Sequence, residues 1–337
     1  MPLQRRHALA ALALTAAVPT WAQAPPRLRV AGVYTVPVTQ PWVGRIDAAL
    51  KVAAARGDID YTAVDNVSAV AAAGAGASDY AGALRQQVAA GVKLIVGESF
   101  GVEAAARQVA REFPTTVFLM ASNGRPQAPN YNVFDNHIHE AAYLSGMVAG
   151  GMSASGKVGL VAGFPVPEVN RLMNAFMAGV RDTNPRARFI VRFIDSWFDP
   201  AAARQAALAL IDQGADLLYA ERPGVVEAAQ ERRVLAIGNV ADLQAQFPDT
   251  VVASALWDMQ PTIDEAVKVV AAGTLFARDY ARYSSLRLKG SSLSPLGSFE
   301  GHVPVAVMER VKARTAAIVS GAFVVRADPG TPRSTLP

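Results

Sequence analysis

The chain has 337 residues, of which 51% are hydrophobic, so it is long enough for one large domain or two smaller ones with substantial cores. It contains 32 Lys and Arg against 28 Asp and Glu, and the basic residues are scattered, which gives no reason to expect a nucleic-acid partner. The absence of cysteine excludes disulfides, thiolate catalysis, cysteine-ligated metals and a lipid-anchored N-terminal cysteine.

The first predicted element is a secretory signal peptide over residues 1–24. Arg5 and Arg6 precede an apolar run, and an Ala-Gln-Ala cleavage site ends at Ala24. The apolar run is too short to span a membrane, and no later run reaches about 18 apolar residues. We therefore expect a protein cleaved after Ala24 that is free in the periplasm, monomeric and not membrane-anchored. The arginine pair leaves general secretion and twin-arginine export both open.

From residue 28 onward, apolar strand-like runs alternate with amphipathic helices. The clearest helical stripe has apolar residues three and four apart from Val169 to Val180. Such alternation predicts an α/β fold of doubly wound parallel sheets with helices on both faces. The predicted strands are 29–33, 60–64, 93–97, 116–120, 158–162, 189–194, 216–220 and 234–237.

A repeated pattern predicts two similar lobes. Segments 86–99 and 209–222 both consist of a helix end, a glycine, a strand and then a glutamate. Many βα units share such a pattern, so the match alone is weak. Combined with the repeated order of strands and helices on either side, however, it indicates that the chain folds into two related halves.

The boundaries of these lobes follow from the order of the elements. We expect the N-terminal lobe to comprise residues 28–135 plus about 258–285, and the C-terminal lobe to comprise 136–256 plus about 300–327. The chain would then cross between the lobes several times. Residues 328–337 are rich in Pro, Gly, Ser and Thr, and we expect them to form a frayed tail.

The residues that follow the predicted strands are candidates for a ligand site. In open parallel sheets, ligands bind beyond the carboxyl ends of the strands, and two lobes that face each other would place those ends along one cleft. The candidate residues are Tyr34, Trp42, Glu98, Ser99, Phe100, Phe164, Pro165, Glu168, Trp197, Phe198, Glu221, Asn239, Asp242, Trp257 and Asp258.

Aromatic residues are concentrated among these candidates. They make up 7% of the chain, yet three of its four tryptophans are candidates, and the fourth is Trp21 in the predicted signal peptide. Aromatic faces beside a few carboxylates and amides suit a flat heterocycle that is stacked and read along its edge by hydrogen bonds. A sugar can also stack on aromatic rings, so the pattern leaves the ligand class open.

Several candidates also have a purely structural interpretation. Trp197 and Phe198 could cap a hydrophobic core. Asp199 followed by Pro200 is typical of a helix start, with the aspartate as N-cap and the proline at the first helical position. Glu168 lies in a first helical turn, where the helix dipole favours a carboxylate whether or not a ligand is present.

Residues that could support catalysis are sparse. His137 and His139 are two residues apart, which suits neither a helical metal pair nor an H-E-x-x-H arrangement. The sequence contains no G-x-S-x-G nucleophile elbow, no phosphate-binding P-loop and no G-x-G-x-x-G after a strand. We therefore expect a binding protein rather than an enzyme, with no cofactor and no metal.

Two stretches carry a family resemblance. GFPVPEVNRLMNAFMAGVRDTNP (163–185) and DSWFDPAAARQAALALIDQGAD (195–216) resemble the BMP family (basic membrane lipoprotein family) of ABC transporter substrate-binding proteins. Shorter matches, GESFG, HEAAYLSGMVAG and IGNVADL, extend the resemblance over most of the mature chain. The resemblance implies a type I periplasmic-binding fold, with two lobes joined by a multi-strand hinge and closing on a purine nucleoside or nucleobase. It also implies ABC transporter permease subunits as partners.

The chain departs from the family's pattern in two places. The first loop of nucleoside-binding members usually carries an Asp and a later Phe-Asn pair, whereas here it reads VYTVPVTQPW (33–42). Because such carboxylates commonly hold ribose hydroxyls, their absence favours a free base, adenine above all, with Trp42 in the stacking role. The lipobox cysteine is missing as well, so the lipid anchor in the family's name does not apply.

We therefore predict an ABC-importer receptor that stacks a purine base between aromatic residues of both lobes. Trp42 and Phe100 would come from the first lobe, and Phe164 and Trp197 from the second. The residues expected to read the base edge are Glu98, Glu168, Glu221, Asn239 or Asp258. Alternatives are a purine nucleoside binder, a sensor that presents its ligand to a signalling receptor, a sugar or small-carboxylate binder, and a periplasmic hydrolase acting in the same cleft.

Overall fold

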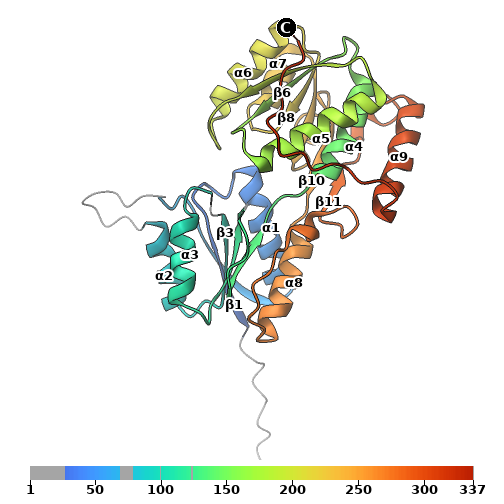
Figure 1. The fold of residues 1–337 in the computed structure, drawn as a ribbon. Helices are drawn as coiled ribbons and strands as arrows, with labels where there is room; N and C mark the ends of the chain where they lie inside the picture. The colour runs from blue at the N-terminus through green and yellow to red at the C-terminus, as the bar shows by residue number, and fades with distance from the viewer. Residues whose placement is uncertain (1–26, 69–78, 99, 123, 337) are drawn as a thin grey trace, which may run out of the picture.

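The computed structural model describes residues 27–68, 79–98, 100–122 and 124–336. The predicted signal peptide and its cleavage site lie outside the described residues. Within them, the chain forms two sheets, each covered by helices on both faces (Figure 1). The expected α/β fold with two parallel-sheet lobes is confirmed. No helix in the described part of the chain is long and apolar enough to span a membrane.

The N-terminal lobe is built on a parallel sheet in the order β2-β1-β3-β4-β5. Its strands are β1 (Leu28–Val33), β2 (Ile59–Val64), β3 (Leu94–Glu98), β4 (Val117–Ala121) and β5 (Tyr131–Phe134). Helices α2 (Tyr80–Ala89) and α3 (Glu103–Glu112) cover one face, and α1 (Pro41–Ala55) and α8 (Gln260–Ala271) cover the other (Figure 1). Buried strand residues alternate between the cores on these two faces, and the central strands β3 and β4 are buried along their whole length, as in a doubly covered sheet.

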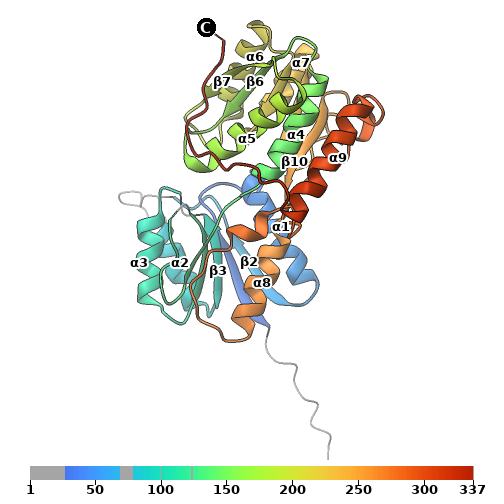
Figure 2. The same cartoon turned by 45° about the vertical axis from the view of Figure 1, so that its right-hand side comes forward.

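The C-terminal lobe contains a sheet in the order β11-β10-β9-β8-β6-β7, in which β11 alone is antiparallel. Its strands are β6 (Lys157–Ala162), β7 (Arg188–Phe193), β8 (Leu217–Ala220), β9 (Leu235–Val240), β10 (Val251–Trp257) and β11 (Ser291–Leu293). Helices α6 (Pro200–Asp212) and α7 (Val225–Arg232) lie on one face, whereas α4 (His139–Met152), α5 (Pro167–Thr183) and α9 (Val305–Ser320) lie on the other (Figures 1 and 2).

The chain passes between the lobes three times within the described residues. It leaves β5 for α4, leaves β10 for α8, and returns through the short 3-10 helix Ala281–Ser284 to β11. Although α8 follows a strand of the second sheet, it packs against α1 of the first lobe, and Val133 of β5 forms a bridge with Asp279. Each lobe is therefore assembled from separate segments of the sequence.

Helices α4 and α5 pack unusually closely, because glycines lie at their interface. A Cβ atom on Gly146 would be 2.1 Å from the carbonyl oxygen of Phe176, and one on Gly179 would be 1.9 Å from that of Tyr143. These distances are too short for any side chain, so the backbones are in direct contact. The packing anchors α5, whose first turn reaches the space between the lobes.

The C-terminal tail is ordered where we expected it to fray. Over residues 328–336, the carbonyl of Pro329 accepts a hydrogen bond from the Asn170 side chain of α5. The Thr335 amide donates to the carbonyl of Phe189 in β7, and the Thr335 hydroxyl accepts from the Phe189 amide. Figure 2 shows this red segment running beside α5 to the edge of the second sheet. The expectation of a frayed tail was wrong, because the tail supplies partners to the edge strand that would otherwise be exposed to solvent.

Candidate functional site

Aromatic side chains from both lobes meet where the carboxyl ends of the two sheets face each other. Phe100 follows β3 of the N-terminal lobe, and Trp197 follows β7 of the C-terminal lobe; their ring centroids are 5.9 Å apart. Phe164, in the loop after β6, packs on Trp197 at 4.8 Å, and Trp42 of α1 meets Phe100 edge-on at 6.1 Å. These four residues, the cleft aromatics, are those that the sequence predicted to stack a ligand.

Trp42 has less freedom than its three partners. Its ring lies 4.9 Å from Trp257 and stacks at 6.2 Å on Phe134, so only 7% of the residue is exposed. Trp257 is completely buried, and its Nε1 donates to Ser284 at 3.1 Å. The structure therefore places Trp257 in the packed core between the lobes, and it leaves little of the Trp42 side chain exposed.

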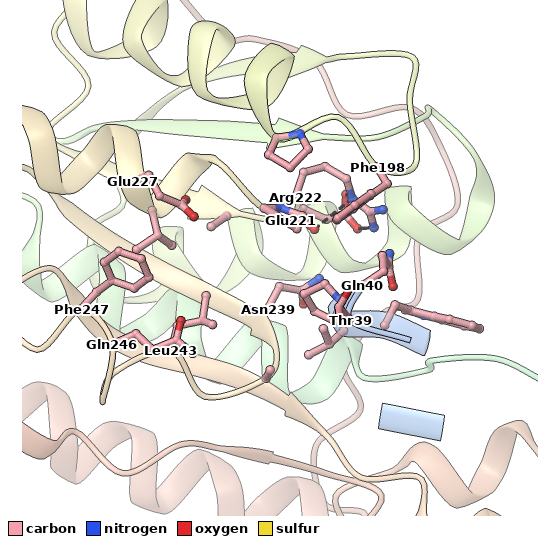
Figure 3. A pocket seen from close by; sticks show the side chains of 18 of the residues that line it. Thr39, Gln40, Phe198, Glu221, Arg222, Glu227, Asn239, Leu243, Gln246 and Phe247 are labelled. Atoms are coloured by element: carbon pink, nitrogen blue, oxygen red, sulfur yellow. Dashed lines mark hydrogen bonds and ion pairs between the residues drawn. The ribbon is translucent and has the colours of Figure 1, made fainter. Parts of the chain in front are cut away.

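A cavity of about 500 Å³ lies next to the cleft aromatics, between the start of α1 and the carboxyl ends of β8 and β9 (Figure 3). This size falls within the range typical of small-molecule sites. Of the sequence candidates, Trp42, Phe198, Glu221, Asn239 and Asp242 line it. The remaining lining residues are Thr39, Gln40, Pro41, Pro200, Ala220, Arg222, Pro223, Val226, Glu227, Val240, Ala241, Leu243, Gln246 and Phe247.

Asn239 and Phe198 supply the two kinds of contact that a flat polar ligand needs. Asn239, near the end of β9, is held in place because its Oδ1 accepts a hydrogen bond of 3.1 Å from the buried Tyr219 hydroxyl. Phe198 is 39% exposed, which is unusual for so large an apolar side chain. Figure 3 shows the two residues on opposite sides of the cavity, with Thr39 and Gln40 of the other lobe beside Asn239.

Glu221 is committed to protein partners. Its Oε2 accepts from Arg222 Nε at 2.7 Å and from the Gly163 amide at 3.0 Å, and its Oε1 accepts from Arg222 Nη2. Arg222 also donates to the carbonyl of Trp197 at 2.8 Å. The pair is almost fully buried, so it ties the strand ends and the Trp197 loop together and leaves no unshared oxygen of Glu221 in this conformation.

Glu168 lies in a buried group of charged residues and is the acid of that group without a basic partner. Asp135 and Arg171 form a pair at 2.5 Å, and Glu221 pairs with Arg222, but Glu168 Oε2 is buried without a hydrogen-bond partner. Burial, and secondarily the charge of Asp135, raises the pKa of Glu168 well above its usual value. The raised pKa favours the protonated acid, which can both donate and accept a hydrogen bond.

Glu98 is a second buried acid with a spare oxygen, at the end of β3. Its Oε1 accepts from both the backbone amide and the hydroxyl of Thr35, whereas its Oε2 has no partner. Burial raises the pKa of Glu98 to about 7, against the opposing effect of the Thr35 hydrogen bonds. Glu98 is also only two residues before Phe100, one of the cleft aromatics, in the sequence.

Four other candidates have different surroundings. Tyr34 is completely buried, with its hydroxyl 3.3 Å from that of Tyr61, so it belongs to the core of the N-terminal lobe. Asp258 is exposed and caps the start of α8 through the Gln260 amide. Pro165 is exposed beside Phe164. Ser99 lies outside the described residues.

Sequence reasoning missed several residues that line the cavity. Gln40 could have been found, because a polar residue before Pro41 marks a helix start, and its side chain does accept from the Val43 amide. Glu227 and Gln246 gave no signal, since they lie within a helix and a loop rather than directly after a strand. They reach the cavity because α7 and the loop after β9 fold toward each other (Figure 3).

The histidines do not form a metal site. His137 and His139 have ring centroids 6.3 Å apart, and burial lowers the pKa of each to about 4, so both are neutral at physiological pH. No cluster of three or more potential metal ligands occurs among the residues that the structure describes.

Two α/β lobes that meet at a cavity beyond their strand ends, with three crossings between them, form the type I fold of periplasmic solute-binding proteins. The chain belongs to the Bmp family, the PnrA-like substrate-binding proteins of ABC transporters, whose model matches residues 46–286. Such a protein is non-catalytic and works on the extracytoplasmic side of the membrane. The resemblance noted from the sequence is thereby confirmed, as is the expectation that the protein is not an enzyme.

Individual relatives differ in what they are named for. A purine-binding protein of Brucella abortus is 32% identical over 75% of this chain and 71% of its own length. A putative ABC transporter glucose-binding protein of Haloferax volcanii is 37% identical, over 54% of this chain and 46% of its own. A solved solute-binding protein from Conexibacter woesei has 25% identity and a TM-score of 0.68, and the match covers 89% of this chain and 99% of that one.

Proposed function

We propose that this chain is the periplasmic receptor of an ABC importer for a purine nucleobase, with adenine the preferred base. It would be exported with cleavage after Ala24, act as a monomer, and deliver its ligand to the permease subunits. The observation that carries the proposal is the contact between Phe100 and Trp197, two aromatic rings from opposite lobes, near the cavity that Trp42 and Phe198 line.

A flat base inserted between these rings would touch both lobes at once. Base–aromatic stacking contributes about 1–3 kcal/mol per base. Because the two faces are supplied by different lobes, the ligand would favour the closed arrangement over an open one, which is the population shift that a transport receptor requires. The purine-binding relative, which aligns with three quarters of the chain, supports the same ligand class.

The edge of the base would be read by groups that still lack partners. In its protonated form, which burial favours, Glu168 can donate to a ring nitrogen and accept from an exocyclic amine, and Glu98 can do the same from the other lobe. Asn239 would add an amide that is already oriented. This assignment keeps Glu221 out of the reading role, because both its oxygens are occupied by Arg222.

Calorimetric titration with adenine, guanine, hypoxanthine, adenosine, ribose and glucose tests the proposal. We expect adenine to bind most tightly, and at 100 times its Kd it should stabilise the protein by about 2.7 kcal/mol in a melting experiment. Binding of glucose or ribose with no response to any purine would overturn the proposal. In that case the second candidate, a sugar receptor, would hold; the glucose-binding relative is the observation that favours it.

A further inference from the structure

Three helices begin at the cavity, from both lobes. α1 starts at Pro41, α6 at Pro200 and α7 at Val225, and residues of each first turn line the cavity. Helix N-termini attract anions, because their first N–H groups are unpaired and the dipole is positive there. From topology alone, the cavity would therefore suit a phosphate or carboxylate.

Side chains from the protein already occupy donors at all three helix starts. Gln40 accepts from the Val43 amide at 2.9 Å, and Asp199 accepts from the Ala202 amide at 2.9 Å. Glu227 accepts from the Gly224 amide at 3.0 Å. Two of these three caps are acids, so they place negative charge where a bound anion would have to lie.

The charges on the cavity wall act in the same direction. Its charged lining residues in the described chain are Glu221, Arg222, Glu227 and Asp242. Glu221 and Arg222 neutralise each other through their two-pronged pair, which leaves Glu227 and Asp242 without a cation on the wall. Both lie at the open rim of the cavity, Glu227 on α7 and Asp242 in the loop after β9.

We infer that Glu227 and Asp242 form a charge filter that admits uncharged purines to the cavity and rejects purines carrying a phosphate or a carboxylate. The inference rests on the proposed function. A cavity of about 500 Å³ exceeds what a flat base fills, and Figure 3 shows Glu227, Gln246 and Phe247 at the end opposite Phe198. A substituent on the base would extend toward that end. There, each carboxylate would repel an anionic substituent and lower its affinity by about tenfold at short range.

The test compares neutral and anionic ligands of matched shape. Calorimetry at about 20 mM ionic strength would use adenine, the pair adenosine and AMP, and the smaller pair adenin-9-ylacetamide and adenin-9-ylacetate. In the wild type we expect the anionic member of each pair to bind about 100-fold more weakly than the neutral one. The gap, meaning the ratio of the affinities of the neutral and anionic ligands, should decrease at about 0.5 M salt, because the charges of Glu227 and Asp242 are partly screened.

Charge-matched variants locate the effect. Glu227→Gln with Asp242→Asn keeps side-chain oxygens that can cap the Gly224 and Gln244 amides, and it should reduce the gap to about tenfold or less. The control, Glu231→Gln with Asp249→Asn, makes the same change in net charge at exposed positions outside the cavity and should leave the gap unchanged. Melting curves would confirm that both variants are folded.

Each other outcome overturns the inference in a recognisable way. Equal binding of neutral and anionic members by the wild type would show that no filter exists. An equal effect of the control variant would show that the discrimination comes from net charge and not from the cavity. Adenine binding without either neutral derivative would show that the far end is not part of the ligand site. No response to any purine would remove the proposed function itself.

Discussion

The rings of Phe100 and Trp197 lie 5.9 Å apart, centroid to centroid, and belong to opposite lobes. Trp197 is held in position by two contacts, because Phe164 packs on its ring and Arg222 donates to its backbone carbonyl. Phe100 is supported by Trp42 at 6.1 Å. Both rings of this contact are therefore supported by neighbouring side chains, and a ligand inserted between them would be bound by both.

Removing one of the two aromatic rings should weaken purine binding without unfolding the protein. Trp197→Ala is expected to cost about 1–3 kcal/mol of binding free energy, because one stacking face is lost. Calorimetry with adenine measures the change. Phe276→Ala, which removes an aromatic residue that is 65% exposed, serves as the control and should bind as the wild type does. Unchanged affinity of the Trp197 variant with a lower melting temperature would assign Trp197 to the core instead.

Replacing Glu168 should separate its hydrogen-bonding role from its charge. Glutamine mimics the protonated form that burial favours, so Glu168→Gln should bind adenine within about threefold of the wild type. Glu168→Ala should lose about tenfold in affinity, the value of one hydrogen bond. Affinity measured at neutral pH decides the matter. A large loss in the glutamine variant would mean that the residue binds its ligand as a carboxylate.

Glu98 should make stability depend on pH in a defined window. Its pKa is about 7 in the folded protein against an ordinary value of 4.5, so the folded state holds a proton that the unfolded state releases. Stability from this group is complete below pH 4.5 and is lost as pH rises to about 7; the difference of 2.5 pKa units corresponds to about 3 kcal/mol.

The variant Glu98→Gln should not lose this stability as the pH rises, because glutamine does not ionise. Chemical denaturation of wild type and variant at pH 4.5 and pH 8 should show the variant gaining relative stability at the higher pH, whereas Asp258→Asn, at an exposed cap, should follow the wild type. Parallel pH profiles of the Glu98 variant and the wild type would contradict the prediction.

A methyl group at the α4–α5 interface should be strongly destabilising. Gly179→Ala would bring Cβ to 1.9 Å from the Tyr143 carbonyl, so the helices must separate, at a cost of about 3 kcal/mol or more. Ala178→Ser, one residue earlier and exposed, should cost about 0.5 kcal/mol through helix propensity alone. The midpoint of urea unfolding compares the two; similar midpoints would show that the interface can relax.

Deleting residues 329–337 should uncover the edge of β7. The tail accepts from Asn170 and pairs with Phe189, so its loss leaves backbone groups of the edge strand without partners. We expect a lower melting temperature and a concentration-dependent association visible by size-exclusion chromatography. A truncated protein that stays monomeric and equally stable would indicate that the tail contacts contribute nothing.

The elements that the sequence predicts well are those with long, regular apolar patterns. All eight predicted strands form within a residue or a few of their expected bounds. β5 was missed because Asn132 interrupts the short apolar run Tyr131–Phe134, and β10 was missed because the apolar run Val251–Trp257 has no period that separates strand from helix. α5 forms as expected, since Pro167 starts it and its apolar stripe is continuous.

The sequence predicts where the candidate residues lie relative to the strands, but it does not predict the directions of their side chains. Tyr34 follows β1 as a ligand residue should, but its ring folds back over Gly32, where a Cβ would lie 2.4 Å from the tyrosine hydroxyl. Glu221 was expected to read a base, yet its neighbour Arg222 claims both oxygens. Contacts of this kind depend on how loops approach each other, which no local pattern in the sequence records.

The three crossings between the lobes have a consequence for how such receptors can be recombined. Because each lobe is assembled from separated stretches, with α8 returned to the first lobe and β11 to the second, no single cut divides the gene into two foldable halves. A chimera that exchanges one lobe with a relative needs matched junctions at all three crossings, near residues 135–138, 258–259 and 285–290. Ligand preference in this architecture would therefore be exchanged more readily by substitutions around the cavity than by shuffling whole lobes.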